Sequence, residues 1–433
     1  MNNAKSIPIL PVLTVNFIGV LGYSIIIPFL VFLVTRFGGN EFVYGLMGAV
    51  YPAFQFFGAP ILGKWSDQIG RRKILVVSQA GTLIAWGLFL MALIIPIVNI
   101  IDIDSAVLGS FTLTIPLVIL FFARALDGLT GGNISVANAY LSDISTDDNR
   151  KANFGKMAMS SSLGFIIGPA IAGVLGATFL EERLPVMAAM LISMVALYLI
   201  VKRLPESKQD LVEPDNKLFK MRKLFQADNR DCYEVRNCPE TGIKAVFKIQ
   251  FVPMMIVIYF LVFLGFSFFY AGFPMHAMRT LSWNSFQLGI FFSFLSGLMI
   301  IFQGPVLTYL SDKVSDSALV IGGTFLLIIN FYMMSLASPW MTYLAAFLFA
   351  AGNGIMWPSF LSMLSKMGGE KKQGTVQGVA NSAGSLASIF GMVLGGFLYS
   401  LWQGNTFLIC AIVLTIVMIF SLKLISIEKS LAK

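Results

Sequence analysis

Twelve long apolar segments dominate this sequence of 433 residues. Each is long enough to cross the hydrocarbon core of a bilayer as an α-helix, because that core is about 30 Å thick and a helix rises about 1.5 Å per residue. The chain is 57% hydrophobic and only 12% charged, whereas soluble domains carry about 25% charged residues. Lipid must therefore solvate most of the surface, and the sequence predicts an all-α membrane protein with twelve transmembrane helices. The predicted spans, with approximate bounds, are 9–35, 43–63, 73–98, 112–140, 152–179, 184–201, 250–277, 285–310, 317–337, 339–365, 373–400 and 405–424.

The positive charges predict the orientation of these spans. Of the 30 Lys and Arg residues, 26 fall in the two tails and in alternate loops, while the opposite loops hold only Arg36, Arg183 and Arg279. Lys and Arg are enriched in cytoplasmic loops, so we predict a multi-pass protein of the cell inner (cytoplasmic) membrane with both termini in the cytoplasm. The net charge of +8 then reflects topology, and no nucleic-acid partner is expected.

A polar stretch at 203–248 separates two halves of six spans each. We predict an N-terminal half at 1–202, a cytoplasmic loop at 203–248 and a C-terminal half at 249–433. Residues recur between the halves: Gly19 as Gly265, and Asp67 as Asp312. This weak internal repeat predicts two pseudo-symmetric bundles in parallel orientation. A solvated linker is the favoured interpretation of the loop; the alternative is a short amphipathic helix around 217–225 on the inner leaflet.

A charged turn lies between the second and third spans, at Gly63 to Lys73. Glycine permits a sharp turn there, and three consecutive cations favour the cytoplasmic side. An ordinary positive-inside loop is the plain alternative. The stretch, however, matches position for position the loop signature of the major facilitator superfamily of transporters, and the chain resembles that family over nearly its whole length. The matching residues are Gly63, Asp67, Gly70, Arg71, Arg72 and Lys73.

This resemblance implies the major facilitator fold and transport by alternating access, with the signature residues and Asp312 acting as a conformational gate. Asp312 is what remains of the signature in the second half, where Ser315, Asp316 and Ser317 replace Gly-Arg-Arg. In this superfamily the first, fourth, seventh and tenth spans line the central path. The candidate cavity residues on those spans, each of which could instead be a contact between helices, are Tyr23, Asn133, Tyr270, Asn353 and Trp357.

An arginine, Arg124, lies in the middle of the fourth span, with Asp127 three residues later on the same helical face. An arginine at the centre of a span costs about 2.5–3.5 kcal/mol on insertion scales and usually faces a cavity or a partner. The two side chains could form a self-neutralising pair that only orients the helix. Alternatively, Asp127 is a titratable site whose protonation balances burial against the nearby positive charge.

The run from Arg124 through Asn133 resembles the fourth-helix motif of proton-coupled drug exporters, especially the tetracycline–proton antiporter group, in which the arginine is assigned to proton coupling. Asp127 stands where those exporters usually have Gln. In the first span, Gly19 stands where the tetracycline group often has an acidic residue. A further motif that marks exporters is matched in the fifth span by Gly164, Gly168, Pro169 and Gly173.

These observations predict a secondary active transporter rather than an enzyme. The favoured activity is proton-coupled export of a small amphipathic drug-like molecule or metabolite, with Arg124 and Asp127 in proton coupling. One alternative is a transporter of an anionic metabolite or siderophore, in which Arg124 binds the substrate; another is a non-transporting receptor on the same fold. The expected partners are a small-molecule substrate, protons and the lipid bilayer. We expect a monomer without cofactor or metal.

Overall fold

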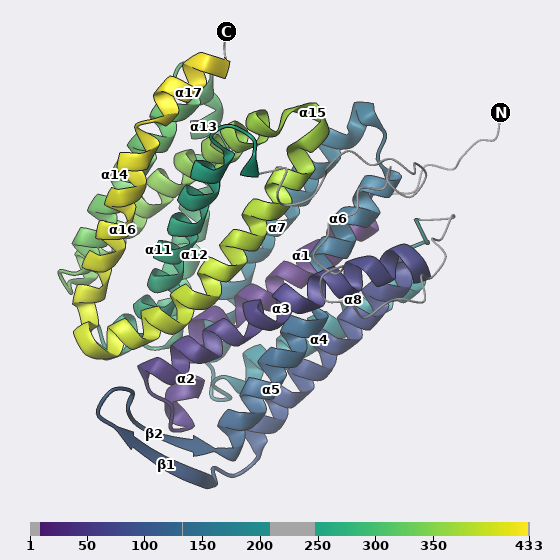
Figure 1. The fold of residues 1–433 in the computed structure, drawn as a ribbon. Coiled ribbons are helices and arrows are strands. Elements are labelled where there is room, and N and C mark those ends of the chain that lie inside the picture. Colours follow the sequence, from purple (N-terminus) through teal and green to yellow (C-terminus); the bar gives the residue numbers. More distant parts are fainter. Residues whose placement is uncertain (1–8, 132, 208–246, 432–433) are drawn as a thin grey trace. The chain divides into compact units, whose positions relative to one another are not determined.

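The computed structural model describes residues 9–131, 133–207 and 247–431 (Figure 1). Contacts divide the chain into two compact units. Unit 1 is Met1–Leu218 together with Trp283–Ser293, and unit 2 is Phe219–Ser282 together with Phe294–Lys433. The segment around 217–225, for which an amphipathic helix was the alternative prediction, lies outside the described residues.

Unit 1 contains the helices of the first six predicted spans and a β-hairpin (Figure 1). Its elements are α1 (Leu10–Ile25), α2 (Ile27–Arg36), α3 (Glu41–Ile69), α4 (Arg71–Ile94), β1 (Asn99–Ser105), β2 (Gly109–Thr114), α5 (Ile115–Thr130), α6 (Asn133–Ile144), α7 (Asp147–Gly176) and α8 (Arg183–Arg203).

Unit 2 contains the remaining helices, except that the first residues of α12 cluster with unit 1. A five-residue π-helix that contains Pro305 follows α12. The elements are α11 (Val252–Arg279), α12 (Ser285–Ile301), the π-helix η2 (Phe302–Val306), α13 (Leu307–Ser311), α14 (Asp316–Met334), α15 (Pro339–Trp402), the 3-10 turn η3 (Gln403–Asn405), α16 (Thr406–Ser421) and α17 (Leu424–Leu431).

All twelve predicted spans coincide with helices, which confirms the predicted helical fold. By length and composition, ten separate helical stretches within the described residues could each cross a membrane. Two features explain why this number is below twelve. The fourth span is divided into α5 and α6, which are each too short to qualify. The last two spans fall into one stretch, Val376–Glu428, because α15, η3 and α16 follow one another almost without a break.

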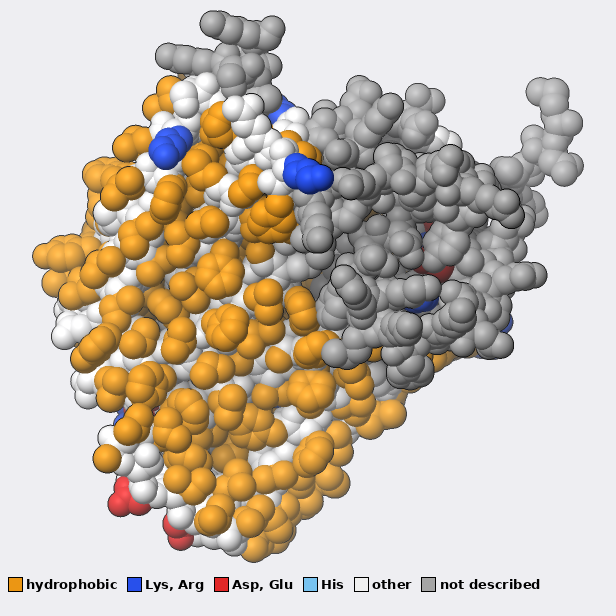
Figure 2. Space-filling view, in the orientation of Figure 1, with side chains coloured by type: hydrophobic (Ala, Val, Ile, Leu, Met, Phe, Trp, Pro, Cys, Tyr) orange, Lys and Arg blue, Asp and Glu red, His pale blue; other side chains and the backbone are white. Residues whose placement is uncertain are grey.

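On the face shown in Figure 2, the coloured side chains are largely apolar, as expected for contact with lipid. Phe179 is 92% exposed and Trp340 is 86% exposed, and many Leu, Ile and Phe side chains on other helices are also exposed. Soluble monomers rarely expose contiguous apolar patches of more than a few hundred Å². The surface therefore requires an apolar solvent.

A β-hairpin lies between α4 and α5, where the sequence analysis expected the fourth span to begin at 112. Strands β1 and β2 pair antiparallel, and α5 starts only at Ile115. The Thr112 amide donates to the Gly38 carbonyl at 2.9 Å, and the Asn40 amide donates to the Leu108 carbonyl at 2.7 Å. These bonds attach the hairpin to the turn between α2 and α3. Pairing between strands depends on contacts that the apolar pattern does not encode, so the sequence analysis did not predict the hairpin.

Two glycines allow α3 and α5 to pack very closely. An added Cβ at Gly58 would overlap the backbone of Leu129, with the Leu129 Cα at 2.9 Å. An added Cβ at Gly128 would overlap the Tyr51 carbonyl and lie 3.0 Å from the Phe54 Cβ. Small residues at helix crossings let membrane helices approach. This crossing brings Tyr51 of α3 against α5.

We expect the Gly58→Ala substitution to destabilise unit 1. The obstructing atoms are backbone atoms, so the helices must separate, and overpacking of this kind typically costs about 1–3 kcal/mol. The measurement is the melting temperature of the purified protein in detergent. Gly87→Ala is the matched control, because an added Cβ there meets no described residue within 4 Å. Equal melting temperatures for the two variants would contradict the close crossing.

An apolar cluster supports the end of unit 1 that carries the signature turn, the charged turn at Gly63 to Lys73. It combines residues from all six spans of the unit, so it fixes the ends of those helices relative to one another. Its members include Val12, Leu62, Leu75, Tyr140, Leu141, Met157 and Ile200.

Candidate functional site

The signature turn joins α3 to α4 through a single residue, Gly70, whose φ is +115°. L-residues with a side chain rarely adopt this conformation. A Cβ at Gly70 would also lie 2.5 Å from a carboxylate oxygen of Glu206. Two independent constraints, backbone conformation and space, therefore require glycine here.

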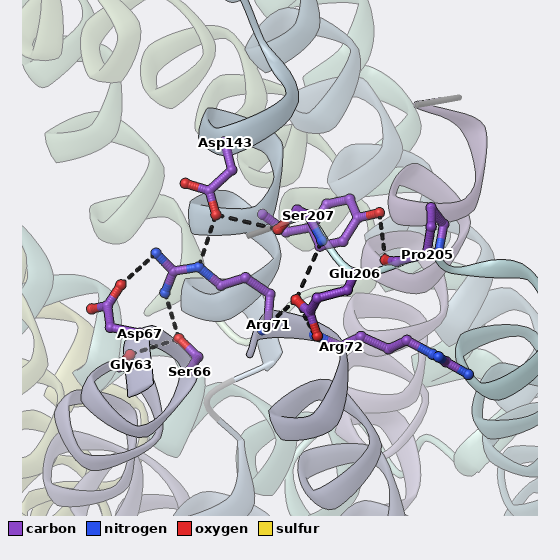
Figure 3. A network of polar contacts seen from close by, with 10 residues as sticks. Gly63, Ser66, Asp67, Arg71, Arg72, Asp143, Pro205, Glu206 and Ser207 are labelled. Atoms are coloured by element: carbon purple, nitrogen blue, oxygen red, sulfur yellow. Dashed lines mark hydrogen bonds and ion pairs between the residues drawn. The ribbon is translucent and has the colours of Figure 1, made fainter. Parts of the chain in front are cut away.

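Arg71 is the centre of a polar network at this turn, with its guanidinium between Asp67 and Asp143 (Figure 3). Its Nη2 lies 2.7 Å from Asp67 Oδ1, and its Nε lies 3.1 Å from Asp143 Oδ2. Nη1 donates to the Ser66 hydroxyl at 2.5 Å. Because α3, α4 and α6 each supply one of the charged groups, the network ties the ends of these three helices together.

Glu206, which follows α8, caps the start of α4. Its Oε1 accepts hydrogen bonds from the backbone amides of Arg71 at 2.7 Å and Arg72 at 3.3 Å. The first amides of a helix lack partners within the helix, and a carboxylate there also interacts favourably with the helix dipole. Ser207 adds a bond to Asp143 at 3.2 Å. We call Ser66, Asp67, Arg71, Asp143 and Glu206 the Arg71 network.

The sequence analysis found Asp67 and Arg71 of this network but missed the others. Asp143 and Glu206 are 72 and 135 residues from Arg71, and no local spacing links them to the turn. Two other predicted gate residues lie outside the network: Lys73 is exposed, and Arg72 reaches the backbone of α8 at Ile200 and Val201. Gly63 contributes its carbonyl, which accepts from the Ser66 hydroxyl at 2.6 Å. In unit 2, Asp312 is exposed at the end of α13.

A second site lies inside unit 1, around Arg124 of α5. Arg124 is only 4% exposed, and its Nη1 lies 3.9 Å from Asp127 Oδ2. The guanidinium carbon lies 4.8 Å from the centre of the Tyr51 ring and 6.0 Å from that of Tyr23. Aromatic faces stabilise a desolvated cation. Arg124 Nε is buried and makes no hydrogen bond to the side chains and backbone that the structure describes.

Asp127 is held more directly by α4 than by Arg124. Its Oδ1 accepts a hydrogen bond from the Thr82 hydroxyl at 2.9 Å. Nearby, the Ser78 hydroxyl donates to the Thr130 carbonyl, and a Cβ at Gly81 would overlap the Thr130 side chain. A polar stripe on α4 thus packs against the Asp127 face of α5. The sequence analysis missed Thr82 and Tyr51, because neither neighbours Arg124 along the chain.

The glycines of the predicted exporter motif lie where α7 contacts other segments of unit 1. An added Cβ at Gly164 would lie 2.9 Å from the Phe17 carbonyl, and one at Gly168 would overlap the Ser24 hydroxyl. Pro169 lies inside α7. Gly173 faces Gly289 of α12: a Cβ added at Gly173 would lie 3.1 Å from the Gly289 Cα.

Most of the candidate cavity residues have described environments. In unit 1, Tyr23 is 5.0 Å from Tyr51, ring centre to ring centre, and so joins the Arg124 site. In unit 2, Trp357 is 4.9 Å from Tyr259. Also in unit 2, Tyr270 packs on Phe269, and Asn353 Nδ2 lies 3.7 Å from Met299 Sδ. The side chain of Asn133 lies outside the described part of the chain.

Comparison with known proteins decides the family. A family model described as Major Facilitator Superfamily matches residues 12–387, with a second match at 255–433. The chain belongs to the major facilitator superfamily. The family prediction is thereby confirmed. As a member of this superfamily the protein is a multi-pass membrane transporter of small molecules and not an enzyme.

Relatives within the superfamily include drug-resistance proteins. The class D tetracycline resistance protein of Salmonella ordonez is 25% identical over 400 residues, covering 92% of this chain and 90% of that protein. Multidrug resistance protein 1 of Bacillus subtilis is 24% identical over 420 residues, covering 95% of each. Among solved structures, the human organic anion transporter MFSD10 (TETRAN) has a TM-score of 0.66 at 17% identity and covers 97% of this chain and 100% of that one.

Proposed function

We propose that this protein exports a small amphipathic drug-like molecule or metabolite and is driven by protons moving in the opposite direction. The observation that carries the proposal is the buried pair on α5, where Arg124 is 4% exposed and lies 3.9 Å from Asp127. Ionisable groups at membrane depth are costly and typically mark ion or substrate pathways. The relatives named for tetracycline and multidrug resistance support export of this substrate class.

In the proposed mechanism Asp127 carries the proton. When ionised, the carboxylate accepts from Thr82 and balances the charge of Arg124; when protonated, it leaves Arg124 without that balance. The electrostatic state of the α5 site therefore changes with each proton bound, and a ligand or ion shifts a conformational equilibrium through such a difference between states. Alternating access between the predicted halves at 1–202 and 249–433, joined by the loop at 203–248, follows this change.

The proposed location is the cell inner membrane, with both termini in the cytoplasm and the protein working as a monomer. The distribution of Lys and Arg between alternate loops supports the orientation. In this orientation the Arg71 network lies at the cytoplasmic ends of α3, α4 and α6 and serves as a conformational gate. The cavity residues Tyr23, Asn133, Tyr270, Asn353 and Trp357, together with the exporter motif at 164–173, complete the proposed machinery.

One observation favours a second candidate, the transport of an anionic metabolite. Arg124 Nε is buried and has no hydrogen-bond partner among the described residues, and a guanidinium is well suited to bind a carboxylate or phosphate. Under this alternative Arg124 contacts the substrate, and Asp127 only holds Arg124 in place.

The test of the proposed function is growth of a drug-sensitive host across a chemical panel that includes tetracycline, with the wild-type protein and with Arg124→Ala. It is followed by proton flux in proteoliposomes on addition of each active compound. Resistance that disappears in the variant, with substrate-induced proton movement in the wild type, supports the proposal. Resistance without proton movement contradicts proton coupling. If no compound changes growth or proton flux, the proposed substrate class is contradicted.

Thr82→Val removes the hydroxyl that donates to Asp127 while keeping the shape of the side chain. A hydrogen bond to a charged group contributes about 1.5–3 kcal/mol. We therefore expect tetracycline efflux under an imposed proton gradient to fall by at least about tenfold. Exchange of tetracycline across the membrane without a gradient should change little, because the carboxylate is needed only for coupling.

Thr82→Ser is the matched control, since it keeps the hydroxyl, and we expect it to retain most gradient-driven efflux. Equal losses in Thr82→Val and Thr82→Ser would indicate a packing effect. Equal losses of gradient-driven efflux and of exchange would contradict a role for Thr82 in coupling.

A further inference from the structure

In unit 2, a carboxylate caps the start of α14 in the same way that Glu206 caps α4. Glu428, on α17, accepts hydrogen bonds from the backbone amides of Asp316 at 3.0 Å and Ser317 at 3.1 Å, and from the Ser317 hydroxyl. In both units the acid comes from the chain that follows the last span of its half. It supplies partners for amides that the helix itself leaves unpaired.

An ion pair next to this cap ties α14 to α15. Lys366 Nζ lies 2.7 Å from Asp316 Oδ2, and the Ser362 hydroxyl donates to the same oxygen at 3.1 Å. Ser362 and Lys366 are one helical turn apart on α15, so both reach the first turn of α14. The Arg71–Asp143 pair links α4 to α6 in unit 1 in a corresponding way.

The internal repeat places these residues at equivalent positions. Asp316 follows Arg71 by 245 residues, which is also the separation between Asp67 and Asp312. Lys366 follows Asp143 by 223 residues, the separation that relates Leu141 to Leu364 and Ser142 to Ser365. Glu428 follows Glu206 by 222 residues. Both halves therefore have a capping acid at an equivalent position, whereas the positive and negative members of the ion pair are in opposite positions.

Helix electrostatics explains why both polarities are possible. Arg71 is the first residue of α4, where a positive charge opposes the helix dipole, and three nearby carboxylates (Asp67, Asp143 and Glu206) compensate for it. Asp316 is the first residue of α14, where a negative charge is favourable, and one cation is enough to complete the pair. The cap supplied by Glu206 or Glu428 satisfies the first amides in either case.

We propose that Asp316, Lys366 and Glu428 form the second-half counterpart of the Arg71 network, with an ion pair of reversed sign, and hold the ends of α14, α15 and α17 together during transport. The loop signature of the second half is then replaced rather than lost. Its functional acid is Asp316, which makes these contacts, and not the exposed Asp312 that matches the signature by position.

The first test measures hydrogen exchange of the amides at 315–319 in the full-length protein in lipid nanodiscs. We compare Asp316→Lys, Lys366→Asp and the double variant that exchanges the two charges. Lys366 is 60% exposed, so the pair is worth at most about 1 kcal/mol, and each single variant should exchange about fivefold faster than wild type. The double variant should return to within about twofold of wild type, because it recreates the polarity found in unit 1.

Asp312→Asn is the control and should leave exchange at 315–319 unchanged, since Asp312 is exposed. Single variants that exchange like the wild type, or a double variant as fast as the singles, would overturn the proposal.

The second test measures tetracycline efflux by the same variants and rests on the proposed transport function. We expect a loss in both single variants and recovery in the double variant. Hydrogen exchange restored without restored efflux would show that the network is structural and takes no part in transport. If the wild type moves no tetracycline, the proposed function fails for this compound, while the exchange measurement still decides whether the reversed network exists.

Discussion

Asp127→Asn is expected to abolish proton-driven efflux while leaving the protein folded. The substitution keeps the shape of the side chain and a carbonyl oxygen that can accept from Thr82, which lies at 2.9 Å in the wild type, but it cannot take up or release a proton. A positioned proton-transfer group typically contributes about a hundredfold or more in rate. Under the proposed function, we expect a loss of that size in efflux, from energised vesicles, of a compound that the wild type exports.

The downhill exchange of the same compound, measured without a proton gradient, separates coupling from folding. We expect exchange to survive in Asp127→Asn, because the substrate path remains. Asp102→Asn is the control: Asp102 is an exposed carboxylate of β1 that accepts from Thr112, and it should retain both activities. Full gradient-driven efflux in Asp127→Asn would show that Asp127 is not the coupling group and would favour the anion alternative, with Arg124 as the substrate ligand.

Arg71→Ala is expected to cause the second large loss. The side chains of Arg71 and Asp143 are 9% and 6% exposed, so the substitution removes the Arg71 cation from contact with a buried carboxylate. Removing one partner of a buried ion pair typically costs about 3–5 kcal/mol. We expect a lower melting temperature in detergent and, under the proposed function, a loss of efflux of an exported compound of more than about tenfold.

Two further variants distinguish the network from the general positive charge of the turn. Lys73→Ala removes an exposed cation two residues away and should be nearly neutral. The double variant Arg71→Asp with Asp143→Lys gives unit 1 the polarity that unit 2 already has at Asp316 and Lys366. We expect it to recover part of the stability that Arg71→Ala loses, because Asp67 and Glu206 remain beside the new carboxylate. A melting temperature as low in the double variant as in Arg71→Ala would mean that the two polarities are not interchangeable.

The Arg124 site and the Arg71 network each combine residues that the sequence predicted with residues that only the structure brings together. Arg124 and Asp127 could be paired from the sequence because an i, i+3 spacing places two side chains on one helical face. Thr82 and Tyr51 could not, since they reach the pair from α4 and α3 across helix contacts. Similarly, the signature indicated Asp67 and Arg71, but Asp143 and Glu206 enter the network only when α6 and the end of α8 pack beside the turn.

The amino-acid sequence by itself determined that lipid solvates most of the protein surface, where the membrane spans lie and to which family the chain belongs. These follow from local properties: the apolar content of each segment, the charges that separate segments, and a short motif that requires glycine at one backbone position. Only the tertiary structure decided which distant groups meet. It showed the hairpin at 99–114, and it showed that the acid and the base occupy opposite positions in the Arg71–Asp143 and Asp316–Lys366 pairs. The physical reason is that such contacts join segments that are far apart in the chain, so no local pattern of residues specifies which groups meet.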